Sequence, residues 1–211
     1  MLARRQLGIL LFDQVEVLDF CGPFEVFSVT RLVEGSHQEA PSPFQVSLIS
    51  ESGAPVLTTG GMKVLADFSF ENCPELDILL VPGGWGTRQE MFNETLLDFV
   101  RTRAPRVEIL ASVCTGALIL ASAGLLDGLP ATTHWKSLDL LQSRFPRVQV
   151  ERQARVVKAG HIITSAGIAA GMDMALTLVA DLHGETIARQ TARHMEYPFP
   201  ERESLSRRGD F

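Results

Sequence analysis

The chain has 211 residues, of which 45% are hydrophobic and 21% are charged, and its net charge is −6 at neutral pH. This composition is ordinary for a soluble globular protein and argues against disorder, and the length suits a single domain, predicted over residues 1–211. The negative charge, without a cluster of Lys and Arg interleaved with aromatic residues, argues against a nucleic-acid partner. No apolar segment reaches the length of a membrane span, so no membrane partner is expected either. The three cysteines have neither CxxC spacing nor the density of a disulfide scaffold, which favours the reducing cytoplasm.

The first half of the chain predicts three buried strands. Residues 6–12 and 77–81 are continuous apolar runs of strand length, and residues 44–50 alternate apolar and polar positions. Between the first strand and the second, Gly22-Pro23 indicates the start of a helix, because proline is tolerated in the first helical turn.

The second half predicts one further central strand and then mostly helices. Residues 107–126 begin as a short buried strand, turn through residues 112–116 and continue as an Ala/Leu-rich helix. Other helices are expected at residues 96–103, 134–144, 167–183 and 184–195, and short strands at residues 148–150, 154–158 and 161–164. Strands that alternate with helices at this spacing predict an α/β fold with a mostly parallel sheet and helices on both faces.

Cys114 lies in the turn between the strand and the helix of residues 107–126. A side chain at such a turn is held at the C-terminal edge of the sheet and points at the helix N-terminus, where unpaired N–H groups and the helix dipole stabilise a thiolate. Gly116 supplies room where the turn passes close to its neighbours. We therefore predict that Cys114 is a nucleophile. The alternative is a small buried residue, since free cysteine is among the most buried residue types.

The Gly-rich turn of residues 82–86, PGGWG, follows the third strand. It is neither a dinucleotide-binding motif nor a P-loop, because it lacks the G-x-G-x-x-G spacing and a following Lys. Sites in open α/β sheets form beyond the C-terminal ends of the strands, so this turn is expected near Cys114. The N–H groups of Gly84 and Thr115 could form an oxyanion hole there. A tight turn that requires a positive φ is the compatible alternative.

Asp19 follows an apolar strand and precedes an apolar helix, where a carboxylate needs a partner. It could be a helix N-cap. If it lies against Cys114 instead, burial and the neighbouring anion raise its pKa and leave a carboxylic acid that donates a proton while the sulfur is ionised. Glu16 is the competing carboxylate, and we rank it lower because it lies in a stretch typical of exposed loop.

Two further polar residues are notable. His134 is a candidate general base or pocket wall, and a structural histidine is an equal alternative. Asp173 lies within an otherwise apolar predicted helix and must be paired or face the crevice, and a structural hydrogen bond to a neighbouring backbone group is the default. The histidines and cysteines show no H-x-x-x-H or C-x-x-C spacing, so no metal site is expected.

Four stretches in combination resemble the ThiJ/PfpI superfamily of class I glutamine amidotransferase-like proteins. They are LLFDQVEVLDFCGPFEVF, DILLVPGGWG, SVCTGALILASAGLLDG followed by ATTHW, and IITSAGIAAGMDMALTLV. The resemblance runs from about residue 7 to residue 197. It implies a flavodoxin-like three-layer α/β/α sandwich, usually a homodimer, with a cysteine at a nucleophile elbow and a carboxylic acid hydrogen-bonded to it.

Within that superfamily, the pattern resembles the isocyanide hydratase branch. This branch carries Leu-Asp in the first loop, here Leu18-Asp19, and Cys-Thr-Gly at the elbow, here Cys114-Thr115-Gly116. The resemblance implies a lyase without a cofactor that converts small apolar isocyanides to N-substituted formamides.

The apolar side chains of Trp85, Trp135 and Ile168 are expected to line a pocket suited to a small neutral substrate. Thr115 stands where PfpI-type proteases carry His, which disfavours protease activity and weakens the alternative of an amidase or deglycase.

The alternative to an enzyme is a redox- or ligand-sensing protein. The same pattern resembles the sensory half of AraC-type regulators. In such a sensor, Cys114 would be oxidised reversibly and a partner would respond to its oxidation state. Cys21 stands where the hydratases more usually carry Thr or another small residue, which adds a second thiol near the site or the dimer interface.

Overall fold

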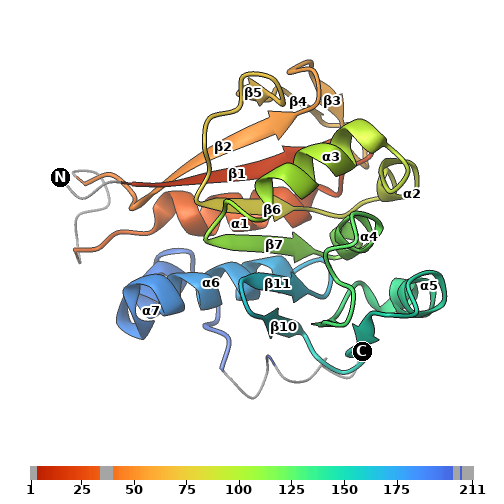
Figure 1. Cartoon of the computed structure of the whole chain (residues 1–211). Helices are drawn as coiled ribbons and strands as arrows, with labels where there is room; N and C mark the ends of the chain where they lie inside the picture. The colour runs from red at the N-terminus through yellow and green to blue at the C-terminus, as the bar shows by residue number, and fades with distance from the viewer. Residues whose placement is uncertain (1–3, 34–39, 202–204, 206–211) are drawn as a thin grey trace.

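A computed structural model of the protein describes residues 4–33, 40–201 and 205. Its centre is a seven-stranded sheet in the order β10-β11-β7-β6-β1-β2-β5 (Figure 1). Neighbouring strands are parallel except for the antiparallel pair of β10 and β11 at one edge. The strands of this sheet are β1 (Arg5–Leu11), β2 (Phe44–Ser50), β5 (Phe68–Ser69), β6 (Ile78–Val81), β7 (Ile109–Val113), β10 (Val156–Ala159) and β11 (Ile162–Ser165). Two small two-stranded sheets pair β3 (Val56–Leu57) with β4 (Lys63–Val64), and β8 (Pro130–Ala131) with β9 (Gln149–Val150).

Helices cover both faces of the sheet. Helices α1, α6 and α7 pack against one another on one face, and α3 and α4 contact each other on the opposite face (Figure 1). The helices are α1 (Val17–Val29), α2 (Thr87–Glu90), α3 (Glu94–Arg103), α4 (Gly116–Ser122), the 3-10 helix η1 (Trp135–Ser137), α5 (Leu138–Arg144), α6 (Ala170–His183) and α7 (Glu185–His194). The predicted flavodoxin-like three-layer sandwich with a mostly parallel sheet is confirmed. Within the described residues, no helix is long and apolar enough to cross a membrane.

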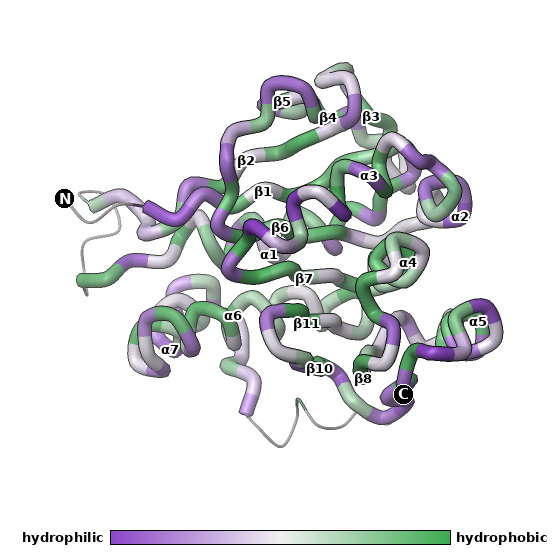
Figure 2. Tube along the Cα trace, viewed as in Figure 1, coloured by the Kyte–Doolittle hydropathy of each residue, from purple (hydrophilic) through white to green (hydrophobic). Residues whose placement is uncertain are grey.

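The central strands form the core. Every residue of β6 and β7 is buried, as are the last five residues of β1, and these strands lie in hydrophobic stretches of the chain (Figure 2). Helices on both faces exclude water from such strands, and each fully buried Leu or Ile stabilises the fold by about 1.5–3 kcal/mol. The parallel arrangement brings the C-terminal ends of β1, β6, β7 and β11 to one edge of the sheet, where the candidate site lies.

Helix α1 begins five residues earlier than the sequence predicts. It starts at Val17 rather than at Gly22-Pro23, and Pro23 lies inside the helix. Gly22 and Pro23 are both buried and approach α6 closely, so tertiary packing outweighs the local preference of these residues. As a result, Asp19 belongs to the first turn of α1 and not to the preceding loop.

Two other predicted helices are shorter than expected. The helix predicted over residues 134–144 is divided into η1 and α5, and α6 starts at Ala170 instead of residue 167. Residues 166–169 are therefore a loop after β11, at the edge of the sheet that carries the Cys114 turn.

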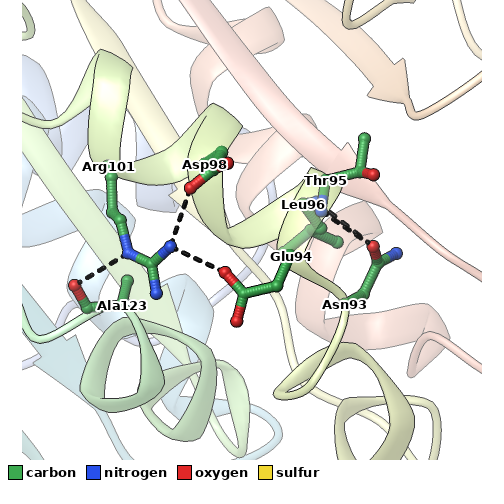
Figure 3. Close-up of polar contacts among 7 residues, drawn as sticks. All are labelled: Asn93, Glu94, Thr95, Leu96, Asp98, Arg101 and Ala123. Carbon is green, nitrogen blue, oxygen red and sulfur yellow. Dashed lines mark hydrogen bonds and ion pairs between the residues drawn. The ribbon is translucent and has the colours of Figure 1, made fainter.

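Polar contacts fix helix α3 at both ends (Figure 3). The Asn93 side chain caps its N-terminus by accepting two backbone N–H groups of the first turn, at 3.1 and 3.4 Å. Arg101 pairs with Glu94 and Asp98 at 2.9 and 2.7 Å and donates to the carbonyl of Ala123 at 3.4 Å. Because Ala123 is the C-cap of α4, this contact ties α3 to the helix that follows Cys114.

Candidate active site

Cys114 occupies a strained turn directly after β7. Its φ of 57° lies in the left-handed region, which is uncommon for a residue with a Cβ and persists only where neighbours hold it. Its N–H group donates to the carbonyls of Ser165 and Ala166 at 3.1 and 3.2 Å, and its own carbonyl accepts the Thr133 hydroxyl at 2.7 Å. Hydrogen bonds from both sides thus hold the elbow predicted from the sequence.

Gly116 lies where the turn after Cys114 packs tightly against a neighbouring strand. A Cβ at this position would lie 2.1 Å from the carbonyl oxygen of Val81, at the end of β6. Only glycine lets α4 start this close to the neighbouring strand. The sequence-based expectation that Gly116 supplies room is confirmed.

The carboxyl group of Asp19 lies at the elbow and is fully buried. Its Oδ2 accepts the N–H group of Gly83 at 3.0 Å, and its side chain interacts with that of Cys114. Among the described residues, no nitrogen or oxygen donor contacts the buried Oδ1. Burial raises the pKa of Asp19 to about 7, although the hydrogen bonds from Cys114 and Gly83 oppose the shift. The structure therefore places Asp19, rather than Glu16, against the thiol.

The thiol of Cys114 is buried as well, and its pKa is raised. Burial is the main cause and the charge of Asp19 is the second, while hydrogen bonds from Thr115 lower the pKa. The stabilisation expected from the N–H groups at the start of α4 is thus present but outweighed by burial and by the carboxylate. Asp19 and Cys114 form a coupled pair, in which a proton on one group affects the other.

The N–H groups of the Gly-rich turn are already engaged. The N–H group of Gly83 donates to Asp19, and that of Gly84 donates to the Thr115 hydroxyl at 3.0 Å. The Thr115 hydroxyl also lies 3.2 Å from the Gly84 carbonyl. The Thr115 hydroxyl thus holds the acceptor position of the Gly84 N–H group, whose oxyanion role stays a prediction. The alternative prediction of a turn with a positive φ is confirmed, since Gly84 has φ 134°.

A pocket of about 200 Å³ opens above the thiol. Its lining residues come from the loops at the C-terminal edge of the sheet. They are Glu16, Gly84, Trp85, Arg88, Cys114, Thr115, His134, Lys136, Ser137 and Ile168. Trp85 and Ile168 lie in this wall, as predicted, and Trp85 is 67% exposed. The prediction for Trp135 is wrong, because this residue is absent from the lining and points to solvent with 61% exposure.

Three polar residues of the pocket escaped the sequence analysis. Arg88 lies in the four-residue helix α2, and Lys136 and Ser137 lie in the three-residue helix η1. These elements are too short for a periodicity to mark which side chains face a cavity. His134 is in the wall, and its Nδ1 accepts the N–H group of Lys136 at 3.3 Å, capping η1. This contact agrees with a structural histidine and leaves its place in the pocket wall intact. Among the residues that the structure describes, no group of three His, Cys, Asp or Glu side chains is arranged to hold a metal.

The fold and the site together define the class of the protein. It is an α/β sandwich protein with a cysteine on a strand–helix elbow and a buried carboxyl group beside that cysteine. The sequence matches the DJ-1/PfpI family over residues 5–181, and the chain belongs to this family. It is 40% identical to isonitrile hydratase of Pseudomonas putida over 192 residues, which is 91% of this chain and 78% of the relative.

Other relatives have different names and lengths. The chain is 29% identical to the transcriptional regulator GbdR of Pseudomonas aeruginosa over 184 residues. These residues are 87% of this chain but only 48% of that regulator. The crystal structure of a ThiJ/PfpI family protein from Pseudomonas syringae superposes with a TM-score of 0.82 at 33% identity, covering 94% of this chain and 77% of that one. The family is therefore shared by enzymes and by regulators about twice as long as this chain.

Proposed function

We propose that the protein is a hydratase that converts isocyanides (isonitriles) to N-substituted formamides. The observation that carries the proposal is the buried pair of Cys114 and Asp19 at the base of a small pocket. The 40% identity to an isonitrile hydratase over most of both chains supports the same chemistry. The protein would act without a cofactor.

The first half of the reaction forms a covalent bond to Cys114. The sulfur attacks the terminal carbon of R–N≡C, and this carbon receives a proton from Asp19, which gives a thioimidate, R–N=CH–S–Cys114. Above the Asp19 pKa of about 7 the pair holds a single proton, and the carboxylate takes up the thiol proton as the sulfur attacks and passes it to the carbon. The unpartnered Oδ1 of Asp19 is the acceptor and donor that the geometry leaves free for this transfer.

The second half of the reaction releases the product. Asp19, now a carboxylate, accepts one proton of a water molecule whose oxygen adds to the thioimidate carbon, and passes this proton to the nitrogen, which leaves a hydroxyl group on the carbon. Collapse of this adduct forms the carbonyl, returns the hydroxyl proton to Asp19 and expels the Cys114 thiolate. The product is R–NH–CHO, so atoms and charges balance with one water consumed for each isocyanide.

The remaining pocket residues orient the substrate. The hydroxyl and N–H group of Thr115 lie beside the sulfur and interact with it, which suits stabilisation of the charge that develops at the reacting atoms. Trp85, Ile168 and His134 supply the walls. A volume of about 200 Å³ is below the range typical of drug-sized ligands, which favours a small R group.

The sensing hypothesis is less well supported by the site. Oxidisable cysteines are exposed and have a low pKa, whereas Cys114 is buried and its pKa is raised. Burial raises the pKa of Cys21 too, and this residue does not line the pocket. An amidase or deglycase would use the same nucleophile, but Thr115 stands at the position of the neighbouring His.

The test is formamide production from a simple aryl isocyanide by the wild type, Cys114→Ala and Asp19→Asn. We expect turnover by the wild type and a loss of at least about 10³-fold in kcat/KM in both variants, because each removes a group that reacts directly. Glu16→Gln is the matched control, since it neutralises the other carboxylate of the pocket. A wild type that produces no formamide and whose Cys114 is stably and selectively oxidised by mild peroxide would replace the hydratase with the sensor.

A further inference from the structure

The pocket above Cys114 contains two cationic side chains that the hydration chemistry does not use. Arg88 belongs to α2, just after the Gly-rich turn, and Lys136 belongs to η1, just after His134. They come from separate segments of the chain and both line the same small cavity. Among the described residues that line the pocket, Glu16 is the only carboxylate, so the charged side chains of the wall carry a net positive charge.

Neither cation is neutralised by an ion pair within the described residues. The salt bridges of the structure involve other Arg and Lys side chains. The guanidinium of Arg88 stacks over Trp85, 4.6 Å from the ring centroid, and donates to the carbonyl of Gly84 at 3.1 Å. Lys136 lies over the ring of Trp135 at 5.0 Å. Contacts with aromatic faces and a carbonyl position the two cations but leave their charge uncompensated.

We propose that the preferred substrate is an isocyanide that carries a carboxylate, with the isocyano carbon at Cys114 and the carboxylate held by Arg88 and Lys136. This inference rests on the proposed hydratase function and names its substrate class. A planar guanidinium held in place by stacking matches the two oxygens of a carboxylate, and an ammonium adds a second donor. Because Arg88 and Lys136 line the same pocket as Cys114, an anionic group bound by these cations would lie close to the reacting carbon. The apolar substrate expected from the sequence is thereby revised to a small anionic one.

The experiment compares two isosteric substrates, isocyanoacetate and isocyanoacetamide. We expect the wild type to prefer the anion by about tenfold or more in kcat/KM, and the preference to fall as ionic strength rises, because the two cations are exposed to solvent. Arg88→Gln and Lys136→Met should each move the ratio of the two kcat/KM values toward one. Arg144→Gln is the matched control, since Arg144 also stacks on an exposed aromatic ring, that of Phe92, at 4.7 Å, but lies outside the pocket, and it should leave the ratio unchanged.

Binding of the hydration product separates this inference from the proposed function. N-formylglycine should bind the wild type more tightly than N-formylglycinamide in calorimetry, and Arg88→Gln should abolish the difference, whether or not the protein turns over isocyanides. Equal kcat/KM values for the two substrates, or a ratio that is insensitive to both substitutions, would overturn the anionic subsite while leaving the hydratase intact. Turnover of neither substrate would count against the hydratase, and equal binding of the two formyl compounds would then overturn the subsite as well.

Discussion

At the scale of single residues, the site depends on one buried carboxyl group. Asp19 has no exposed surface, its Oδ2 is fixed by the Gly83 N–H group, and its pKa is raised to about 7. A carboxylic acid with this pKa exchanges its proton near neutral pH, which is the range in which general acid–base catalysis is most effective. The cysteine beside it is the nucleophile only if Asp19 can accept its proton.

The pH dependence of activity follows from this pair. Below the pKa of Asp19 both groups are protonated and no base is available, so kcat/KM should rise with pH through a midpoint near 7. It should fall again only at high pH, when the second proton is lost from the raised thiol. Glu16→Gln should lower the midpoint slightly, since Glu16 is the smallest of the causes that shift Asp19. A pH profile that is flat between pH 5 and 9 would contradict the assignment.

The burial of Asp19 should also lower the free energy of unfolding when its carboxyl group is ionised. Its pKa rises from 3.8 to about 7 on folding, so the folded state binds this proton more tightly than the unfolded state. The folded state is therefore progressively destabilised as pH rises from about 4 to about 7. One pKa unit corresponds to about 1.4 kcal/mol, which gives a cost of about 4 kcal/mol above pH 7. Asp19→Asn keeps an acceptor for Gly83 and does not titrate, so in urea unfolding its stability relative to the wild type should increase between pH 5 and pH 8. An equal difference at both pH values would show that Asp19 carries no such cost.

At the scale of elements, helix α6 carries two aspartates in opposite environments. Asp173 is buried, and its oxygens contact Arg155 and, at 2.8 Å, the hydroxyl of Tyr197. Asp181, on the same helix, pairs with Lys158 of β10, but both of these side chains are exposed. The prediction that Asp173 is paired is confirmed, but the expected backbone partner is wrong, because its side-chain oxygens contact the side chains of Arg155 and Tyr197. The identity of the partners was not predictable, because they lie in distant segments that only the fold brings to α6.

These two pairs form a matched test of burial. Asp173→Asn should lower the free energy of unfolding by about 3 kcal/mol, because it leaves the guanidinium of Arg155 unpaired at a largely buried position. Asp181→Asn should cost less than about 1 kcal/mol, since water solvates both partners of that exposed pair. Urea unfolding at pH 7 measures both values. Equal effects of the two substitutions would contradict a stabilising role for the buried group.

At the scale of the whole molecule, apolar patterning predicted the sheet because a strand buried on both faces needs a continuous apolar run. The elbow at Cys114 was equally visible, since its strand, turn and helix are contiguous in the chain. The start of α1 and the charged side of the pocket were not predictable. Pro23 is accommodated by packing against α6, while Arg88 and Lys136 meet only after folding. A homodimer and a cytoplasmic location stay predictions from the sequence.

The proposed hydration of isocyanides requires a covalent bond between Cys114 and the isocyanide carbon. Intact-protein mass spectrometry after a rapid acid quench, with enzyme in excess over an aryl isocyanide, measures that bond directly. We expect the mass of the protein to increase by the mass of one isocyanide, with the adduct on Cys114, and the adduct to decay as the formamide appears. Cys114→Ala should show neither the adduct nor the product. Formamide formed at the wild-type rate with no adduct on Cys114 at any time would contradict the account.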